Sequence, residues 1–206
     1  MSDFETQARL SAPSVARNRE PIFAVLDPLL APAARVLELA SGSGEHAIFM
    51  ARKRPDVMWQ PSDPAPEARA SIAAWIAAEG IANARAPLAL DASAAEWPVE
   101  TVDAMVCINM LHISPWAATE GLMRGAARHL PPGGPLYIYG AFRRAGAITP
   151  ESNTAFDQDL KRRDPRWGLR LLEEVDACAA GQGLHLAEVV AMPANNLSLV
   201  FRKRGA

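Results

Sequence analysis

A short apolar strand that runs into a glycine loop and then into a helix constrains this chain most. Residues 35–40 read Arg-Val-Leu-Glu-Leu-Ala, and the loop Ser41-Gly42-Ser43-Gly44 follows directly. Residues 45–54 then show apolar residues at helical spacing, with Glu45 in the first turn and three basic residues in the last, which suits the helix dipole. Glycines at such a turn let the backbone bend sharply and come close to a ligand. The chain is therefore expected to fold as an α/β protein around this turn.

Strand and helix patterns alternate along the rest of the chain. Strands are predicted at residues 35–40, 57–60, 87–90, 102–109, 136–139, 185–192 and 197–202, and helices at 21–29, 45–54, 67–79, 116–130, 154–163 and 172–180. This alternation predicts a parallel sheet with helices on both faces. The short connection between the last two strands makes that pair antiparallel. We therefore predict a Rossmann-like α/β fold of the class I methyltransferase kind, with a seven-stranded, mostly parallel sheet and an antiparallel last strand.

Composition excludes several classes of protein. The net charge of −2 gives no electrostatic case for a nucleic-acid partner. Cys107 and Cys178 form no spaced pair, so neither a disulfide framework nor a metal site is predicted. No apolar run reaches the ~18–20 residues that a membrane-spanning helix needs. The N-terminus carries Asp3 and Glu5 and lacks an apolar signal core, so we expect a cytoplasmic protein.

The length of 206 residues suits one domain with a full core. Within a single domain of residues 1–206, residues 1–20 are polar and are expected to form an N-terminal arm or lid. Residues 141–170 are expected to form a polar excursion on the substrate side. A monomer or a homodimer fits this organisation.

Three acids, Glu38, Asp63 and Asp91, stand at or near the ends of the first three predicted strands. In open α/β sheets, ligands bind at the carboxyl ends of the strands. S-adenosylmethionine offers matching groups, namely a cationic amino acid head, a ribose diol and an adenine amine, and it has no phosphate. Asp63 suits a carboxylate that accepts both ribose hydroxyls, and Asp91-Ala92 would lie beside the adenine. We therefore predict S-adenosylmethionine as the cofactor, with S-adenosylhomocysteine as its product.

Two other interpretations of the loop remain open. The glycines can form a strand-to-helix turn with no ligand, with the acids simply solvated. The loop can also bind a nicotinamide dinucleotide, because sites for that cofactor likewise place an acidic residue after the second strand, where it binds the ribose. That cofactor places its pyrophosphate on the helix N-terminus, where Glu45 would repel it, and the loop lacks a third glycine, with Ala47 nearby.

Eight segments of the chain resemble one family. They are residues 16–22, 36–46, 59–63, 109–116, 119–122, 151–153, 164–168 and 192–196. The sequences His-Ile-Ser-Pro-Trp at 112–116 and Pro-Ala-Asn-Asn at 193–196 are the most specific of these. Together the segments resemble the methyltransferase-like protein 26 family, long catalogued as a domain of unknown function, over nearly the whole chain. The resemblance implies a class I fold and S-adenosylmethionine binding, and it supplies no substrate.

Two positions depart from the expected patterns. Ala40 stands where many methyltransferases have the first glycine of the loop, although a small residue still fits. Leu171 stands where the family pattern continues with an acid, which puts a local ion pair of Arg170 in doubt.

The predicted cofactor site joins the loop, the strand ends and the N-terminal arm. Its residues are Arg17, Asn18, Glu38, Ala40, Gly42, Ser43, Gly44, His46, Asp63, Pro64, Asp91, Ala92, Asn109 and Met110. Arg17 and Asn18 belong to a polar cluster that can fold over the cofactor or can simply cap the helix that follows.

The predicted catalytic residues are Asn109 and His112, after the fourth strand, and Tyr139, at the end of the fifth. Methyl transfer needs mainly a close and aligned acceptor, and it needs a base only when the acceptor must lose a proton. The ordinary pKa of histidine, near 6.5, suits His112 to that role, although a packing histidine is the alternative. We predict a methyltransferase with a small-molecule acceptor. An oxidoreductase on a related sheet and a non-catalytic protein that binds S-adenosylmethionine are the alternatives.

Overall fold

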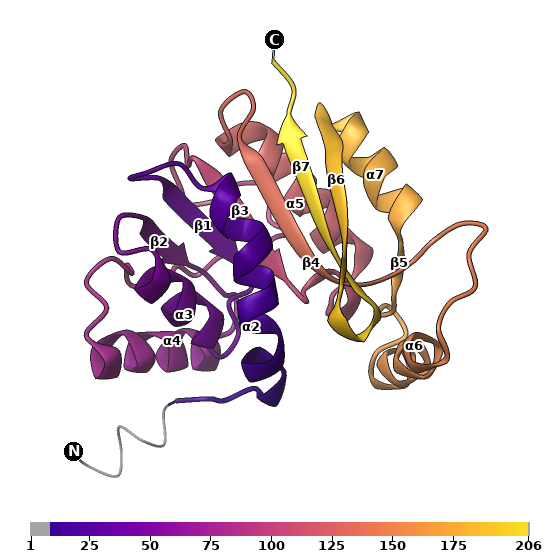
Figure 1. Cartoon of the computed structure of the whole chain (residues 1–206), viewed down its shortest axis with the longest axis horizontal. Coiled ribbons are helices and arrows are strands. Elements are labelled where there is room, and N and C mark those ends of the chain that lie inside the picture. Colours follow the sequence, from indigo (N-terminus) through magenta and orange to yellow (C-terminus); the bar gives the residue numbers. More distant parts are fainter. Residues whose placement is uncertain (1–8, 206) are drawn as a thin grey trace.

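The computed structural model describes residues 9–205, and a mixed sheet forms its centre (Figure 1). The strands are β1 (Arg35–Leu39), β2 (Met58–Pro61), β3 (Ala104–Ile108), β4 (Pro135–Arg143), β5 (Arg170–Leu171), β6 (Leu184–Met192) and β7 (Asn196–Lys203). Their order is β2-β1-β3-β4-β7-β6, and β5 pairs with the end of β4. β7 runs antiparallel to both of its neighbours, whereas β1 to β4 are parallel. The predicted fold class is confirmed, including the antiparallel last strand.

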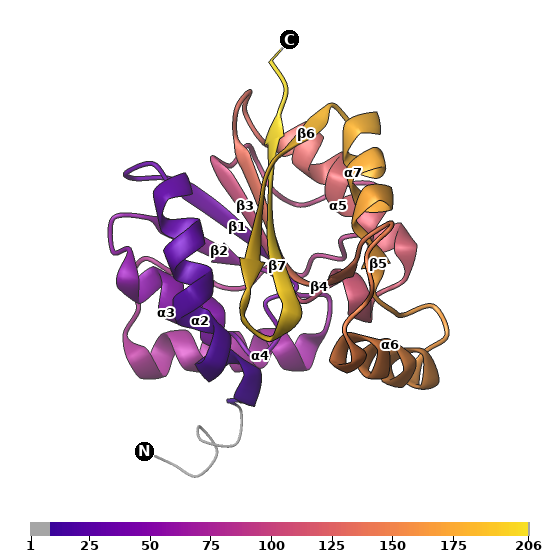
Figure 2. The ribbon, with the colours of Figure 1, turned by 45° about the vertical axis from the view of Figure 1, so that its right-hand side comes forward.

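Helices cover both faces of this sheet (Figures 1 and 2). They are α2 (Pro13–Leu26), α3 (Glu45–Lys53), α4 (Pro66–Glu79), α5 (Trp116–His129), α6 (Glu151–Arg163) and α7 (Leu172–Gly181), with short 3-10 turns at Asp27–Leu29, Leu111–Ile113 and Pro193–Asn195. Buried side chains of α2 and α3 pack on one face, and those of α5 and α7 pack on the other. β3 is buried along its whole length because it is apolar on both sides, as its sequence predicts.

The N-terminal prediction is corrected by α2. Residues 13–20 form a helix instead of a flexible arm, and Pro21, expected at the first helical position, lies inside that helix. Pro13 takes the initial position, where its missing N–H removes no helical hydrogen bond. Val15 and Ile22, two turns apart, are both buried, so tertiary packing holds the helix despite Pro21. Residues 1–8 of the predicted arm lie outside the described residues.

The third predicted strand, residues 87–90, is also corrected. The segment makes only an isolated bridge between Leu88 and Ser62, and it forms no ladder of its own. Pro87 has no N–H to donate, which limits pairing at the start of the segment. Leu88 still exchanges two backbone hydrogen bonds with the end of β2, with Pro61 and Asp63 over 3.0 Å each. The extended segment therefore still delivers Asp91 to the carboxyl edge of the sheet, and the seventh strand is β5.

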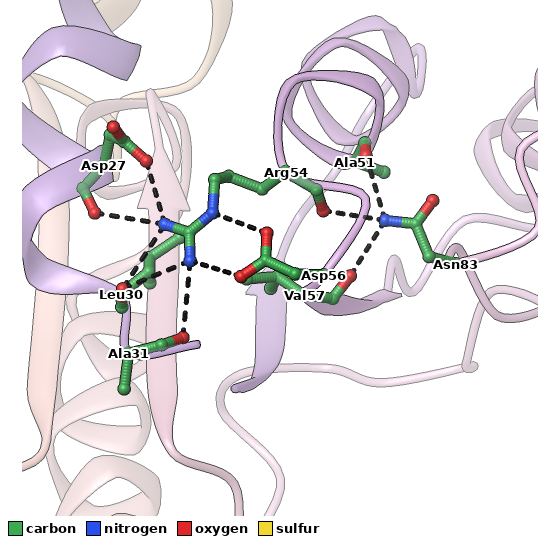
Figure 3. A network of polar contacts seen from close by, with 8 residues as sticks. All are labelled: Asp27, Leu30, Ala31, Ala51, Arg54, Asp56, Val57 and Asn83. Carbon is green, nitrogen blue, oxygen red and sulfur yellow. Dashed lines mark hydrogen bonds and ion pairs between the residues drawn. The ribbon is translucent and has the colours of Figure 1, made fainter. Parts of the chain in front are cut away.

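The C-terminal end of α3 is fixed by an arginine network (Figure 3). Arg54 donates to Asp27 over 2.8 Å and to Asp56 over 2.7 Å, and it reaches the backbone carbonyl of Leu30. Its side chain is only 16% exposed. Beside it, Asn83 donates to three backbone carbonyls of the same turn. Arg54, predicted among the basic residues of the last helical turn, therefore ties the loop after α2 to the start of β2.

The predicted excursion, residues 141–170, is largely ordered by secondary structure. β4 continues to Arg143, α6 begins at Glu151, and β5 starts at Arg170. Leu160 and Leu169 are buried against Ala141, which anchors α6 to the end of β4. Within residues 9–205, no helix is long and apolar enough to cross a membrane.

Candidate functional site

The loop after β1 turns through three residues with positive φ: Ala40 at 53°, Gly42 at 57° and Gly44 at 91°. A Cβ on Gly44 would lie 2.9 Å from Cα of Ile72, so this glycine allows α4 to pack against the loop. A Cβ on Gly42 would meet no described atom within 4 Å. Gly44 is thus required by packing within the protein, and Gly42 faces open space at the carboxyl edge of the sheet.

The carboxylate of Asp63 joins the end of β2 to this loop. Oδ2 accepts a hydrogen bond of 3.0 Å from the backbone N–H of Gly42, and Oδ1 accepts one of 3.0 Å from Ala65. Each carboxylate oxygen can accept a second hydrogen bond, because an ionised carboxylate has about four lone-pair positions. The geometry therefore fits a carboxylate that holds the loop and can also accept from two vicinal hydroxyls.

Glu38 is buried beneath the loop at the end of β1, with 1% of its surface exposed. Nε1 of Trp59 donates to its Oε2 over 2.6 Å. Burial raises the pKa of Glu38 to about 8, the Trp59 hydrogen bond lowers it in part, and the charge of Asp63 raises it further. A cation beside this carboxyl would stabilise its ionised form. The environment of Glu38 thus suits the ammonium group of an amino acid head, and no sequence signal marks Trp59 as its hydrogen-bond partner.

A cleft of about 580 Å³, here called the first cleft, opens beside Asp63. Its lining includes six residues that the sequence assigned to the cofactor: Ala40, Asp63, Pro64, Asp91, Ala92 and Met110. Asp91 Oδ1 accepts hydrogen bonds from the N–H and hydroxyl of Ser93, which closes a tight turn. Trp167 and Arg166 line the cleft from the other side. The predicted ribose and adenine residues therefore line one cavity.

Glu45 fills the N-terminus of α3. Its Oε2 accepts from the backbone N–H of Ala12 over 2.6 Å and from the Ser43 hydroxyl over 2.9 Å, and its Oε1 accepts from Ser11 over 3.1 Å. A carboxylate here is stabilised by the helix dipole, and it accepts hydrogen bonds from the residues just before α2. The same charge disfavours a pyrophosphate at this helix end.

The helix α2 brings Asn18 to the site. Its Oδ1 lies 2.9 Å from Nε2 of His46. Burial lowers the pKa of His46 to about 4, so the imidazole is neutral and donates this hydrogen bond. Arg17 is exposed on the same helix and is not among the residues that line the first cleft or the cleft described next.

A second cleft, of about 700 Å³, contains all three predicted catalytic residues. It is lined by Ser14, Asn18, Asn109, His112, Tyr139, Ala141, Ser152, Asn153, Phe156, Ala194 and Asn196. The ring of His112 packs on Gly140, where a Cβ would come within 3.2 Å of its Nδ1, and it meets Phe156 edge-on at 5.3 Å. Gly140 therefore has a defined task, which is to make room for this imidazole.

Burial lowers the pKa of His112 to about 4, and the charge of Arg170 lowers it further. None of the side-chain hydrogen bonds found among the described residues involves a ring nitrogen of His112, and the imidazole lines the second cleft. Burial likewise raises the pKa of Tyr139, and the neighbouring Asn18 side chain acts in the opposite direction. Both groups are uncharged near neutral pH.

The two clefts are separated by a single segment, residues 109–113, after β3. Asn109 and His112 face the second cleft, whereas Met110 and Ile113 line the first. Asn109 has φ 59°, a conformation that asparagine tolerates better than most residues, and its N–H donates to Tyr139 O over 2.8 Å. A cofactor whose adenosine lies in the first cleft would present its far end to the second.

Arg170 holds this segment in place, a role that sequence reasoning missed. Its Nε donates to the carbonyl of Leu111 over 2.9 Å, and its Nη2 donates to the carbonyls of Ser114 and Arg166. The guanidinium also lies 5.8 Å from the ring of Trp116. Carbonyl groups thus take the place of the acid that the family pattern suggested, and no sequence signal marks such partners.

The far wall of the second cleft joins α6 to the turn between β6 and β7. Asn153 donates to the carbonyl of Asn195 over 3.0 Å, and Asn195 donates to the hydroxyl of Ser152 over 3.1 Å. Asn195 has φ 58°, a left-handed conformation that asparagine tolerates in turns. Asn196 both caps this turn, through hydrogen bonds to Pro193 and Ala194, and lines the second cleft.

Solved structures with the same fold define the class. An O-methyltransferase family protein from Burkholderia thailandensis superposes with a TM-score of 0.80 at 18% identity, over 94% of this chain and 58% of that one. Human N-acetylserotonin methyltransferase, solved with S-adenosylmethionine, gives a TM-score of 0.76 at 14% identity, over 98% and 55%. This chain therefore spans little more than half the length of those proteins. Its architecture is the Rossmann-like class I methyltransferase fold.

At the level of sequence, the chain belongs to the family described as "Protein of unknown function (DUF938)", whose model matches residues 9–203. That match extends from the segment before α2 to the last residue of β7, so it includes every residue of both clefts.

Proposed function

We propose that this protein is an S-adenosylmethionine-dependent methyltransferase that acts on a small-molecule acceptor. The observation that carries the proposal is the pair of clefts on either side of residues 109–113. One is lined by the acids and small residues that suit an adenosine. The other is lined by Asn109, His112 and Tyr139, which suit an acceptor.

The residues present fit the cofactor in three places. Asp63 would accept hydrogen bonds from the ribose, Asp91 and Ala92 would flank the adenine, and buried Glu38 would receive the ammonium group. Gly42 would allow the backbone to approach, because no described atom occupies the position of its Cβ. When bound, S-adenosylmethionine supplies a methyl group already activated on a sulfonium sulfur.

The protein's own residues then act mainly by position. Asn109 would orient the acceptor from its fixed backbone conformation, and Arg170 would keep the segment that carries Asn109 and His112 rigid through its bonds to backbone carbonyls. Holding two reactants in line can supply a large share of a rate enhancement. The methylated atom, whether oxygen, nitrogen or sulfur, is left open by this proposal.

A nicotinamide dinucleotide is the less favoured cofactor. The N-terminus of α3, where its pyrophosphate would bind, already carries the Glu45 carboxylate, which is engaged by Ser11, Ala12 and Ser43. A non-catalytic role is disfavoured by the second cleft, because a binding protein needs no polar cavity beside the cofactor.

Calorimetric titration of the purified protein tests the proposal. S-adenosylhomocysteine is expected to bind at one site, and NADH is not. Asp63→Ala should weaken that binding at least tenfold, since it removes the ribose acceptor and the bond to Gly42. Asp159→Asn, an exposed acid paired only with Arg162 in the described structure, is the matched control. Binding of NADH without S-adenosylhomocysteine would overturn the proposal.

The resemblance to the methyltransferase-like protein 26 family stays part of this proposal, since it rests on the segments quoted above. The proposal also includes a cytoplasmic protein that acts as a monomer or homodimer, and the net charge of −2 supports the absence of a nucleic-acid partner.

A further inference from the structure

The second cleft is lined entirely by uncharged groups. Among the described residues, its lining includes no Asp, Glu, Lys or Arg. The charge of Arg170 lowers the pKa of His112, and its guanidinium donates to the carbonyls of Leu111, Ser114 and Arg166. Its donors are therefore used by backbone carbonyls, and it offers no counter-ion to a ligand in the cleft.

A charged ligand would lose its hydration in this cleft without gaining a counter-ion, which is unfavourable. A neutral ligand meets no such penalty, because amide and hydroxyl groups can satisfy its polar atoms. Asn153, for example, uses its Nδ2 to bond Asn195, and its Oδ1 remains available as an acceptor. The lining thus selects for an uncharged molecule.

The wall beside His112 is aromatic. Phe156 is 37% exposed and meets the imidazole edge-on, with ring centroids 5.3 Å apart and an interplanar angle of 70°. Aromatic rings prefer such offset or edge-to-face arrangements. A ring in the ligand can therefore pack on Phe156 while a substituent reaches the nitrogen of His112.

His112 is a weak base, since burial holds its pKa at about 4. The acidity of the acceptor then decides whether a proton can move. A phenolic hydroxyl has a pKa of about 10, whereas an aliphatic hydroxyl is close to water, at about 15.7. Proton transfer to His112 is uphill by roughly six powers of ten from a phenol and by roughly twelve from an aliphatic hydroxyl. The phenol therefore loses its proton more readily, as the bond to the methyl carbon forms.

We propose that the second cleft accepts an uncharged phenol and that His112 takes the proton of its hydroxyl. This assignment rests on the proposed methyltransferase function. The phenolic oxygen forms a bond to the methyl carbon as the sulfur–carbon bond breaks, and the electron pair of that bond stays on sulfur. The hydroxyl proton passes to a ring nitrogen of His112 and then to water, so charge and atoms balance.

Three phenols of similar size and different charge test the assignment. They are 4-hydroxybenzamide, which is neutral, 4-hydroxybenzoate, which is anionic, and tyramine, which is cationic. Each is titrated into the protein saturated with S-adenosylhomocysteine, and binding is followed by ligand-observed NMR. We expect the neutral phenol to bind at least tenfold more tightly than either charged one.

Two variants at Ser152 on the rim of the second cleft locate the binding. Ser152→Asp keeps an acceptor for Asn195 and adds a negative charge, and Ser152→Lys adds a positive one. Ser152→Lys should strengthen 4-hydroxybenzoate binding severalfold, and Ser152→Asp should do the same for tyramine. His112→Gln should reduce methylation of 4-hydroxybenzamide about 10²–10⁴-fold, the usual loss of a general base, with its binding unchanged.

Three results are distinguishable. Failure of S-adenosylhomocysteine to bind would overturn the proposed function and this assignment with it. If the cofactor product binds and a charged phenol is preferred, or none of the three binds, the assignment is wrong and the methyltransferase proposal stands. Unchanged turnover in His112→Gln would remove His112 as the base.

Discussion

Trp59 and Glu38 form a buried pair that spans two adjacent strands: Nε1 of the indole donates to Oε2 of the carboxyl over 2.6 Å. Trp59 is fully buried, and Glu38 is 1% exposed. The pair lies directly under the glycine loop, where the Trp59 hydrogen bond offsets part of the increase that burial causes in the pKa of Glu38, a predicted cofactor ligand. The same hydrogen bond therefore joins β1 to β2 and affects the ionisation of a residue at the carboxyl edge of the sheet.

Trp59→Phe should destabilise the protein by about 1–3 kcal/mol, the usual cost of leaving a buried polar group without its partner. Phenylalanine lacks the second ring of the indole, so the cavity that it leaves at this fully buried position adds to the cost. Trp75→Phe is the matched control, because its indole N–H bonds only the exposed carbonyl of Leu10 over 3.0 Å. Urea denaturation measures both variants. Equal losses in the two would show that the Glu38 partner is unimportant.

Glu38→Gln should change how stability depends on pH. The folded-state pKa of Glu38, about 8, lies above its ordinary value of 4.5. The folded protein therefore holds this proton more tightly, so the contribution of Glu38 is full below pH 4.5 and is lost as the pH rises through 8. Glu38→Gln should lack that loss, which reaches up to about 1.4 kcal/mol per pH unit. Parallel curves for wild type and variant from pH 5 to 8.5 would contradict this.

His46 should give the opposite dependence. Its folded-state pKa, about 4, lies below the ordinary 6.5, so the neutral form stabilises the fold above pH 6.5 and that contribution is lost as the pH falls through 4. His46→Gln keeps a donor for Asn18 and removes the titration. The free energy of unfolding at pH 7.5 and pH 5, measured in urea, should differ less in the variant. A larger difference in the variant would refute the buried neutral imidazole.

Alanine at the two loop glycines should separate binding from folding. Gly44→Ala places a Cβ 2.9 Å from the backbone of Ile72 and should destabilise by about 1–3 kcal/mol. Gly42→Ala meets no described atom, so it should cost only about 1 kcal/mol of backbone strain and should weaken S-adenosylhomocysteine binding at least tenfold. Thermal denaturation and calorimetric titration give the two readouts. Similar effects of both variants on binding would count against ligand approach at Gly42.

Ala40→Gly tests the departure noted at the first loop position. Ala40 has φ 53°, a conformation that costs a residue with a Cβ roughly 1 kcal/mol. Glycine should therefore stabilise the protein by up to about 1 kcal/mol, as measured by urea denaturation. A destabilised variant would show that the methyl group of Ala40 contributes packing that outweighs its backbone strain.

Local pattern predicted most of the fold, because the strands of this sheet are short apolar runs with turns between them. The exceptions have physical reasons. Pro21 suggested a helix start, yet the burial of Val15 and Ile22 extends α2 across it. Residues 87–90 have the composition of a strand, yet they pair with β2 at only a few points.

Residues of the candidate site could be predicted where the residue type and a position after a strand are enough to mark them, as for Asp63 and His112. They could not be predicted where long-range contacts decide. Glu45 was expected only to suit the helix dipole, and it also accepts hydrogen bonds from the segment before α2. An ion pair of Arg170 was in doubt because Leu171 stands in place of an acid, and Arg170 donates to backbone carbonyls. Such partners depend on how distant segments meet, which periodicity and spacing do not encode.

A crystal structure of the protein with S-adenosylhomocysteine tests the central claim most directly. The account predicts the ribose hydroxyls within hydrogen-bond distance of Asp63, the adenine in the first cleft beside Asp91 and Ala92, and the sulfur facing the second cleft near Asn109. Density for the ligand elsewhere on the protein, or a ligand whose sulfur points away from the cleft of His112, would contradict it.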